Sequence, residues 1–373
     1  MLCKLIRPVY GIFLTDHDNN TMELLTEFIR VSLGTQSKLS KSPSIAEWDE
    51  LFVMGQRQAI AGVLFTALDK LSNNNQKPPT ELLFEWLGVY EQIRNTNRKI
   101  NKCCLELSQH FLSHGIKTCI LKGQGNALLY PDKYCRTPGD IDIWTDADKD
   151  IIRKLVRKKY PNVAECSWHI DYPFYPDTTV EVHYIPSYLR HPKYAKRLQA
   201  FYEEYKVMQF VHFVEMPESG GIIAVPTFEV NVIQQLSHVM RHYFVEGIGL
   251  RQIIDLFYLL SSNNGKSNVD FQCVLSDLGM LKFSRAVMWI LHEKMGLEKD
   301  KMIVPPDAKR GRFVYEEILR GGNWGMYDKR KHSLINNICG TYPYVERALR
   351  QGILFPEEAV MTPIYRKILK KEI

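Results

Sequence analysis

The sequence lacks the features that are typical of membrane proteins, signal peptides and zinc ribbons. None of its hydrophobic runs approaches the roughly 18 residues that a membrane helix requires, so we expect no membrane-spanning segment and no membrane partner. The apolar stretch near the start is interrupted by Arg7 and Pro8 and has no small-residue cleavage site, which predicts mature sequence rather than a signal peptide. The eight cysteines include no C-x-x-C pair, which argues against a zinc ribbon and favours reduced thiols in a cytoplasmic protein.

Neither the charge nor the composition is extreme. The 373 residues include 48 Lys and Arg against 42 Asp and Glu, and the resulting net charge of +6 permits an anionic partner without requiring one. Hydrophobic residues make up 45% and charged residues 24%, which excludes a disordered chain, a collagen-like fibre and a small disulfide scaffold. There is no internal repeat, and the length predicts about two or three domains.

The two ends of the chain have helical patterns and the middle does not. Apolar residues recur at helical spacing through 21–112, where the last stretch ends at Gly115, a residue type that commonly follows helices. Helical spacing returns from Phe228 onward. Between these parts, across 116–186, the pattern reads as strand, turn and short helix, strand, basic amphipathic helix and strand, which predicts an α/β or α+β domain.

Three carboxylates lie on two of the predicted strands. Asp140 and Asp142 are two residues apart, so on a strand they share one face at about 6.5–7 Å. Their mutual repulsion makes joint burial costly unless a cation compensates it. Glu181, between Val180 and Val182, supplies a third carboxylate. Three such groups suit Mg²⁺ and could hold two ions about 3.5–4 Å apart around a phosphoryl group; the alternative for each is an ordinary solvated strand carboxylate.

A glycine turn precedes the aspartates. Gly123 and Gly125 have no side chains, so the backbone can approach a ligand closely where a helix begins, and its amides can face phosphate oxygens. Lys122 and Arg136 flank this turn and the aspartates, and either could contact phosphate. The alternatives are a simple turn, a solvated lysine and a structural ion pair of the arginine.

These elements resemble the nucleotidyltransferase fold of the DNA polymerase β superfamily, and more closely a bacterial branch of uncharacterised nucleotidyltransferases. The matching elements are Lys122-Gly123, Ala127-Leu128, Tyr130-Pro131, Arg136, Gly139-Asp140-Ile141-Asp142 and Glu181-Val182-His183, followed by a helical region with His238, His242 and 250–256. Gln124 stands in the turn where the superfamily usually has serine or glycine. The Lys-Gly opening is also similar, less closely, to nucleotidyltransferase toxins of abortive-infection systems.

The resemblance implies an α+β fold, with a mixed β-sheet nucleotidyltransferase domain at 113–227 flanked by helical regions at 1–112 and 228–373. It also implies transfer of a nucleoside monophosphate from an NTP to an acceptor hydroxyl, with release of pyrophosphate and with Mg²⁺ or Mn²⁺ as cofactor. The implied metal-binding and catalytic residues are Asp140, Asp142 and Glu181, and the implied nucleotide-binding residues are Lys122, Gly123, Gln124, Gly125, Arg136 and His183.

The acceptor is not predicted and could be a small molecule, a protein or RNA. One alternative function is a catalytically inactive nucleotide-binding or regulatory module, and another is a toxin-like enzyme that acts on tRNA. Basic residues cluster at 153–159 and 190–197, near Tyr188 and Tyr194. Such clusters are usually solvated faces, but they could also form a track for an RNA backbone.

Four further residues occur in pairs spaced four apart. His238 and His242 would share one helix face, and we expect them to contact the nucleotide or pack against the central domain rather than bind zinc. Arg251 and Asp255 are expected to form an ion pair along their helix.

Overall fold

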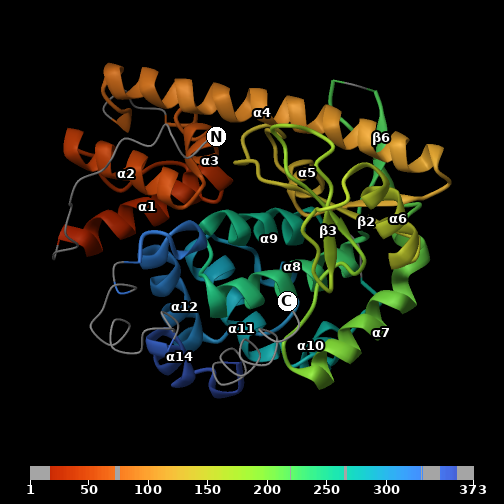
Figure 1. Cartoon of the computed structure of the whole chain (residues 1–373). Coiled ribbons are helices and arrows are strands. Elements are labelled where there is room, and N and C mark those ends of the chain that lie inside the picture. The colour runs from red at the N-terminus through yellow and green to blue at the C-terminus, as the bar shows by residue number, and fades with distance from the viewer. Residues whose placement is uncertain are drawn as a thin grey trace.

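The structure is a computed structural model and describes residues 17–71, 76–218, 220–263, 267–328, 330 and 345–358. Helices surround a small mixed sheet (Figure 1). The expected α+β class is confirmed. Within these residues, no helix is long and apolar enough to cross a membrane.

The N-terminal region consists of helices, as expected. They are α1 (His17–Leu33), α2 (Ile45–Arg57), α3 (Ala61–Phe65) and α4 (Thr80–Ser113). The helical pattern of 45–71 is broken at Ala59, which has a φ of 57° and separates α2 from α3. Helix α4 runs past α1–α3 and continues over the sheet (Figure 1), so that one long element borders both parts of the molecule.

The central sheet has the order β1-β2-β4-β3. Its strands are β1 (Thr118–Leu121), β2 (Ile141–Thr145), β3 (His169–Asp171) and β4 (Val180–His183). Strands β2 and β4 are parallel, whereas β1 pairs with β2 and β3 with β4 in antiparallel fashion. The expected strands correspond to β1, β2 and β4, while β3 was not expected. Helix α5 (Gly123–Ala127) follows β1, and α6 (Lys149–Lys159) follows β2.

The described residues that follow the sheet are mainly helical. Helix α7 (Pro192–Gln209) leads into a hairpin of β5 (Phe213–Glu215) and β6 (Ile222–Ala224), which the sequence did not indicate. The following helices are α8 (Phe228–Val245), α9 (Leu250–Ser262), α10 (Phe271–Asp277), α11 (Leu281–Trp289), α12 (Ala308–Gly321) and α14 (Val345–Gly352). A π-helical turn at Ile290–Lys294 continues α11, and short 3₁₀ turns lie at Lys299–Lys301 and Asn323–Gly325.

The two larger buried clusters among the described residues hold these elements together. One joins N-terminal residues such as Phe28 and Trp86 to C-terminal residues such as Ile233, so the helices of both ends share a core. The other lies under the sheet, where Ile143 and Val156 pack between β2 and α6. The division at residues 112 and 227 stays a prediction.

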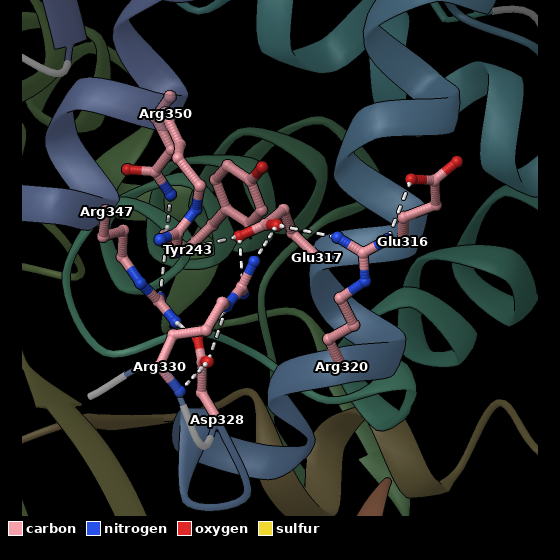
Figure 2. Close-up of polar contacts among 9 residues, drawn as sticks. Tyr243, Glu316, Glu317, Arg320, Asp328, Arg330, Arg347 and Arg350 are labelled. Atoms are coloured by element: carbon pink, nitrogen blue, oxygen red, sulfur yellow. Dashed lines mark hydrogen bonds and ion pairs between the residues drawn. The ribbon is translucent and has the colours of Figure 1, made fainter. Parts of the chain in front are cut away.

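A network of arginines and acids ties helix α14 to the body of the molecule (Figure 2). Asp328 accepts hydrogen bonds from Arg330 at 2.8 and 2.9 Å and lies 3.3 Å from Arg347 of α14. Glu317 of α12 lies 2.8 Å from the same Arg330. Arg347 also donates to the Tyr243 carbonyl of α8 at 3.2 Å. This network therefore joins α8, α12 and α14.

Candidate active site

The sheet brings the three predicted carboxylates together. Parallel pairing of β2 and β4 places Asp142 directly beside Glu181, and Asp140 comes two residues before Asp142, just ahead of β2. Their oxygen atoms lie within 4.8 Å of one another. Asp142 is buried, Glu181 is half-buried and Asp140 is exposed. All three line one cavity, and their roles as ligands or catalytic groups stay a prediction.

The carboxylate of Asp142 has a lysine and a histidine as close neighbours. Lys122 Nζ and His183 Nε2 each lie 2.8 Å from its Oδ1 atom. Burial raises the pKa of Asp142, but the lysine charge and the histidine hydrogen bond outweigh burial and hold that pKa below its usual value. The pKa of Asp140 is raised, chiefly by the negative charge of Asp142. The two aspartates thus have different proton affinities.

Glu181 lies between two histidine rings. Its Oε2 atom is 3.0 Å from His169 Nδ1 and 3.3 Å from His183 Nε2. Burial raises the pKa of Glu181, but the two rings more than offset burial and lower it. Burial in turn lowers the pKa of His169, and contacts with Cys166 and Glu181 outweigh burial and raise it to about 10. The sequence prediction included His183 and missed His169.

The glycine turn contributes two of its four residues to the cavity. Lys122 and Gly123 line it, whereas Gln124 and Gly125 do not. The Gln124 side chain is buried and donates to Asn101 of α4. A Cβ atom at Gly125 would lie 3.2 Å from the Ile120 carbonyl oxygen, so this glycine lets α5 pack closely on β1. The expected contact of these two residues with phosphate therefore has no support in the geometry.

Arg136 lines the cavity but is held by a carboxylate. Its Nε and Nη2 atoms donate to the two oxygens of Asp255 at 2.7 and 2.8 Å, and Tyr130 donates to the same group at 2.7 Å. Arg251 instead donates to the Thr137 carbonyl at 3.0 Å. The prediction of an ion pair between Arg251 and Asp255 is wrong. Among the described residues, Asp255 forms its ion pair with Arg136.

Helices α8 and α9 form the wall of the cavity that faces the sheet. The cavity has a volume of about 280 Å³, and His238, Arg241 and His242 of α8 and Arg251 of α9 line it. Burial and nearby cations lower the pKa of His238 well below its usual value and that of His242 to about 4, so both rings are neutral at pH 7. Within the described residues, neither ring belongs to a group that could hold a metal ion. His238 Nδ1 lies 3.4 Å from Lys122 Nζ, so the expected contact with the central domain is confirmed for His238. The alternative, contact with the nucleotide, stays a prediction.

Sequence reasoning missed an aromatic stack in the same cavity. The rings of Trp168 and Tyr188 stack with centroids 4.1 Å apart, and the Arg241 guanidinium lies 4.7 Å from the Tyr188 centroid. All three residues line the cavity. Stacked rings capped by a guanidinium are typical of sites that bind planar groups. Only Tyr188 was noted from the sequence, as a neighbour of basic residues.

A second cavity of about 430 Å³ adjoins the first. The two share Gly139, Asp140, Arg251 and Trp324. Trp324 has a φ of 56°, a conformation that non-glycine residues rarely adopt. Apart from Asp140 and Arg251, every described residue that lines this second cavity is uncharged.

The basic clusters are partly neutralised. Arg153 and Arg157 of α6 lie 2.9 and 2.8 Å from Glu165, and Arg197 of α7 lies 3.3 Å from Asp277. These pairs reduce the positive charge that a nucleic-acid backbone would meet.

Comparison with known proteins gives two matches. A family model described as an uncharacterised nucleotidyltransferase matches residues 44–295. The chain also aligns with the crystal structure of an antigenic nucleotidyltransferase-like protein from Paracoccidioides brasiliensis, at 16% identity over 53% of this chain and 92% of that one, with a TM-score of 0.32. No curated protein matches the sequence.

Proposed function

Because the chain belongs to a family of uncharacterised nucleotidyltransferases, we propose that it moves a nucleoside monophosphate from a nucleoside triphosphate to an acceptor hydroxyl. The acceptor oxygen bonds to the α-phosphorus, the bond from that phosphorus to the β-bridging oxygen breaks, and pyrophosphate leaves with this electron pair. The observation that carries the proposal is the convergence of Asp140, Asp142 and Glu181 within 4.8 Å in a cavity that also contains Lys122.

The donor set fits the expected cofactor. Asp140, Asp142 and Glu181 offer only carboxylate oxygens, which Mg²⁺ and Mn²⁺ accept, and they would hold the metal. When bound, such ions neutralise charge on the phosphates and favour ionisation of the acceptor hydroxyl. Glu181 and Asp140 are the carboxylates that could take the hydroxyl proton, and Asp140, whose pKa is raised, is the stronger base, because two histidines lower the pKa of Glu181.

We assign the triphosphate to the side of the cavity that contains Lys122 and Gly123. The lysine ammonium supplies a point charge, and the glycine leaves room for a phosphate. His183 holds Asp142 in position through its 2.8 Å hydrogen bond. We assign positioning roles to Gln124, Gly125 and Arg136, because their partners are protein groups.

We propose that the acceptor enters through the second cavity. Its volume of about 430 Å³ suits a small molecule, and it meets the first cavity at Asp140. A nucleic-acid backbone would require cations, whereas the described lining has one arginine and one aspartate, which is shared with the metal-binding group. These features favour an uncharged small molecule with a hydroxyl group over tRNA or another RNA.

Labelling tests the proposal directly. The purified chain is incubated with Mg²⁺, each α-labelled NTP and either a small-molecule or a macromolecular fraction of a cell extract. We expect the wild type to label a small molecule and release pyrophosphate, and Asp142→Asn to lower the rate at least about a hundredfold. Asp150→Asn, an exposed acid on α6, is the matched control and should retain activity.

The other outcomes separate the alternatives. Labelling of RNA that Asp142→Asn abolishes would favour the toxin-like function, and labelling of protein would favour a protein modifier. NTP binding without pyrophosphate release in any fraction would favour an inactive nucleotide-binding module. Equal labelling by wild type and Asp142→Asn would show that the site is misassigned.

A further inference from the structure

A second group of metal-binding side chains lies beside the three carboxylates. Ring nitrogens of His169 and His183 and a carboxylate oxygen of Glu181 lie within 4.8 Å of one another. Both rings approach the same oxygen, Glu181 Oε2, at 3.0 and 3.3 Å. Two imidazoles and one carboxylate make this group chemically different from the group that contains only oxygen ligands.

The strand register produces this arrangement. In the antiparallel pair of β3 and β4, His169 lies directly opposite His183. Glu181 precedes His183 by two residues on β4, so both side chains are on the same face of the sheet. The three side chains are therefore brought together by the backbone pairing and do not depend on a loop conformation.

The second nitrogen of each ring faces an acceptor. His183 Nδ1 is 3.3 Å from the Ile185 carbonyl oxygen. A carbonyl oxygen can only accept, so Nδ1 donates, and Nε2 is the atom that can bind a metal once the ion displaces the proton that Nε2 donates to Asp142. His169 Nε2 is 3.6 Å from Asp171 Oδ1, which leaves Nδ1 toward Glu181. Histidines that bind metals are commonly oriented in this way by a carbonyl or a carboxylate.

We propose that His169, Glu181 and His183 bind a divalent transition-metal ion of the kind that imidazole ligates, such as Zn²⁺. Imidazole nitrogen favours these metals, whereas Mg²⁺ favours oxygen ligands. Three protein ligands leave a coordination position open for water or substrate, as in catalytic zinc sites. All three residues line the cavity of about 280 Å³, so that position faces it.

The cavity would thus hold two unlike cations. Glu181 belongs to both groups, and His183 Nε2 lies 2.8 Å from Asp142, so the two ions would be neighbours. The significance of this pair for catalysis rests on the proposed function, but the binding of the second ion rests on the side-chain geometry alone.

Cobalt(II) is a suitable probe, because its visible absorption reports nitrogen ligation. The full chain is treated with a chelator and then titrated with Co²⁺ in an excess of Mg²⁺. We expect one equivalent to bind with distinct visible bands, and His169→Ala or His183→Ala to lose the bands and weaken binding at least tenfold. Asp171→Asn, which removes only the carboxylate behind His169, should weaken binding about 10- to 100-fold.

Two control variants make the result specific. His242→Ala removes a histidine of the same cavity that lies outside the group, and Asp140→Asn removes a ligand of the oxygen-only group; both should keep the bands. The proposal is overturned if the wild type shows no bands, if both histidine variants keep them, or if only Asp140→Asn loses them. Circular dichroism verifies folding, and His169→Ala is decisive if His183→Ala does not fold, because the His169 side chain is the more exposed, at 18% against 6%.

This result is separable from the proposed function. A chain that binds Co²⁺ as expected but labels nothing would support the second metal site and count against nucleotide transfer. A chain that labels its acceptor with Mg²⁺ but shows no cobalt bands would support nucleotide transfer and overturn the second metal site.

Discussion

At the scale of single residues, Lys122 has an unusual backbone conformation. Its φ of 47° and ψ of −137° lie in a region that favours glycine, and such conformations cost about 1–3 kcal/mol. The conformation turns the chain from β1 into α5 and places the lysine ammonium 2.8 Å from Asp142. The position therefore combines an unfavourable backbone with a buried ion pair.

Two substitutions of Lys122 separate these contributions. Lys122→Ala and Lys122→Gly both remove the ammonium, but only glycine adopts the native φ without strain. We expect Lys122→Ala to be less stable than Lys122→Gly by about 1 kcal/mol in urea unfolding. Both variants should lose NTP binding to a similar degree, measured with a fluorescent NTP analogue. Equal stability of the two would mean that the backbone carries no strain in solution.

The positions of some site residues could be predicted from the sequence, and those of others could not. The two-residue periodicity around Asp140 and Asp142 predicted that they share a face, and the Val-Glu-Val pattern predicted that Glu181 lies on a strand. The pattern could not predict whether the Gln124 side chain points into the cavity or toward α4, because the residue types of a glycine turn do not fix the direction of a side chain within it. Nor could it predict that Asp255 forms an ion pair with Arg136 and not with Arg251, because tertiary packing determines which distant segments come into contact.

At the scale of elements, one buried ion pair fastens the segment before β2 to α9. The guanidinium of Arg136 and the carboxylate of Asp255 are only 6% and 4% exposed. Removal of one partner from such a pair leaves a buried charge without compensation. The pair thereby fixes the chain just ahead of Asp140.

Substitution of this pair tests whether Arg136 positions the site or contacts phosphate. We expect Arg136→Met to reduce the free energy of unfolding by about 3–5 kcal/mol, and the double variant Arg136→Met/Asp255→Leu to recover most of it. If Arg136 only positions the site, the double variant binds a fluorescent NTP analogue as the wild type does. If the double variant is stable but no longer binds the NTP analogue, Arg136 contacts the nucleotide, as the sequence predicted.

The missed elements have a common cause. Strand β3 has only three residues and lies between prolines and turns, so its periodicity is too short to distinguish from a loop. The same applies to the hairpin of β5 and β6. Consequently His169 was missed, although it directly faces His183 across the sheet.

At the scale of the whole molecule, the network around Asp328 controls how α14 is held. Burial raises the pKa of Asp328, but Arg330 outweighs burial and, with Arg347, lowers it to about 2. A carboxylate with a lowered pKa stabilises the folded state above its unfolded pKa of about 4, and this contribution disappears as the pH falls toward 2. The network should therefore weaken in acid.

The pH dependence of unfolding tests this network. At pH 7 we expect Asp328→Asn to be less stable than the wild type by about 2–3 kcal/mol, and the difference to shrink between pH 4 and about pH 2. Asp300→Asn, an exposed acid in a 3₁₀ turn, is the control and should change stability little at any pH. A difference that stays constant over this range would mean that Asp328 contributes by packing and not by charge.

The enclosure of the cavity by distant segments has a consequence for the order of events during synthesis. The acids lie before residue 182, whereas the helices opposite them begin at residue 228. A chain emerging from the ribosome therefore carries its three acids uncovered until α8 and α9 have been made and docked. Because α8 and α9 complete the cavity, we expect the proposed activity to require that these two helices have been made and docked.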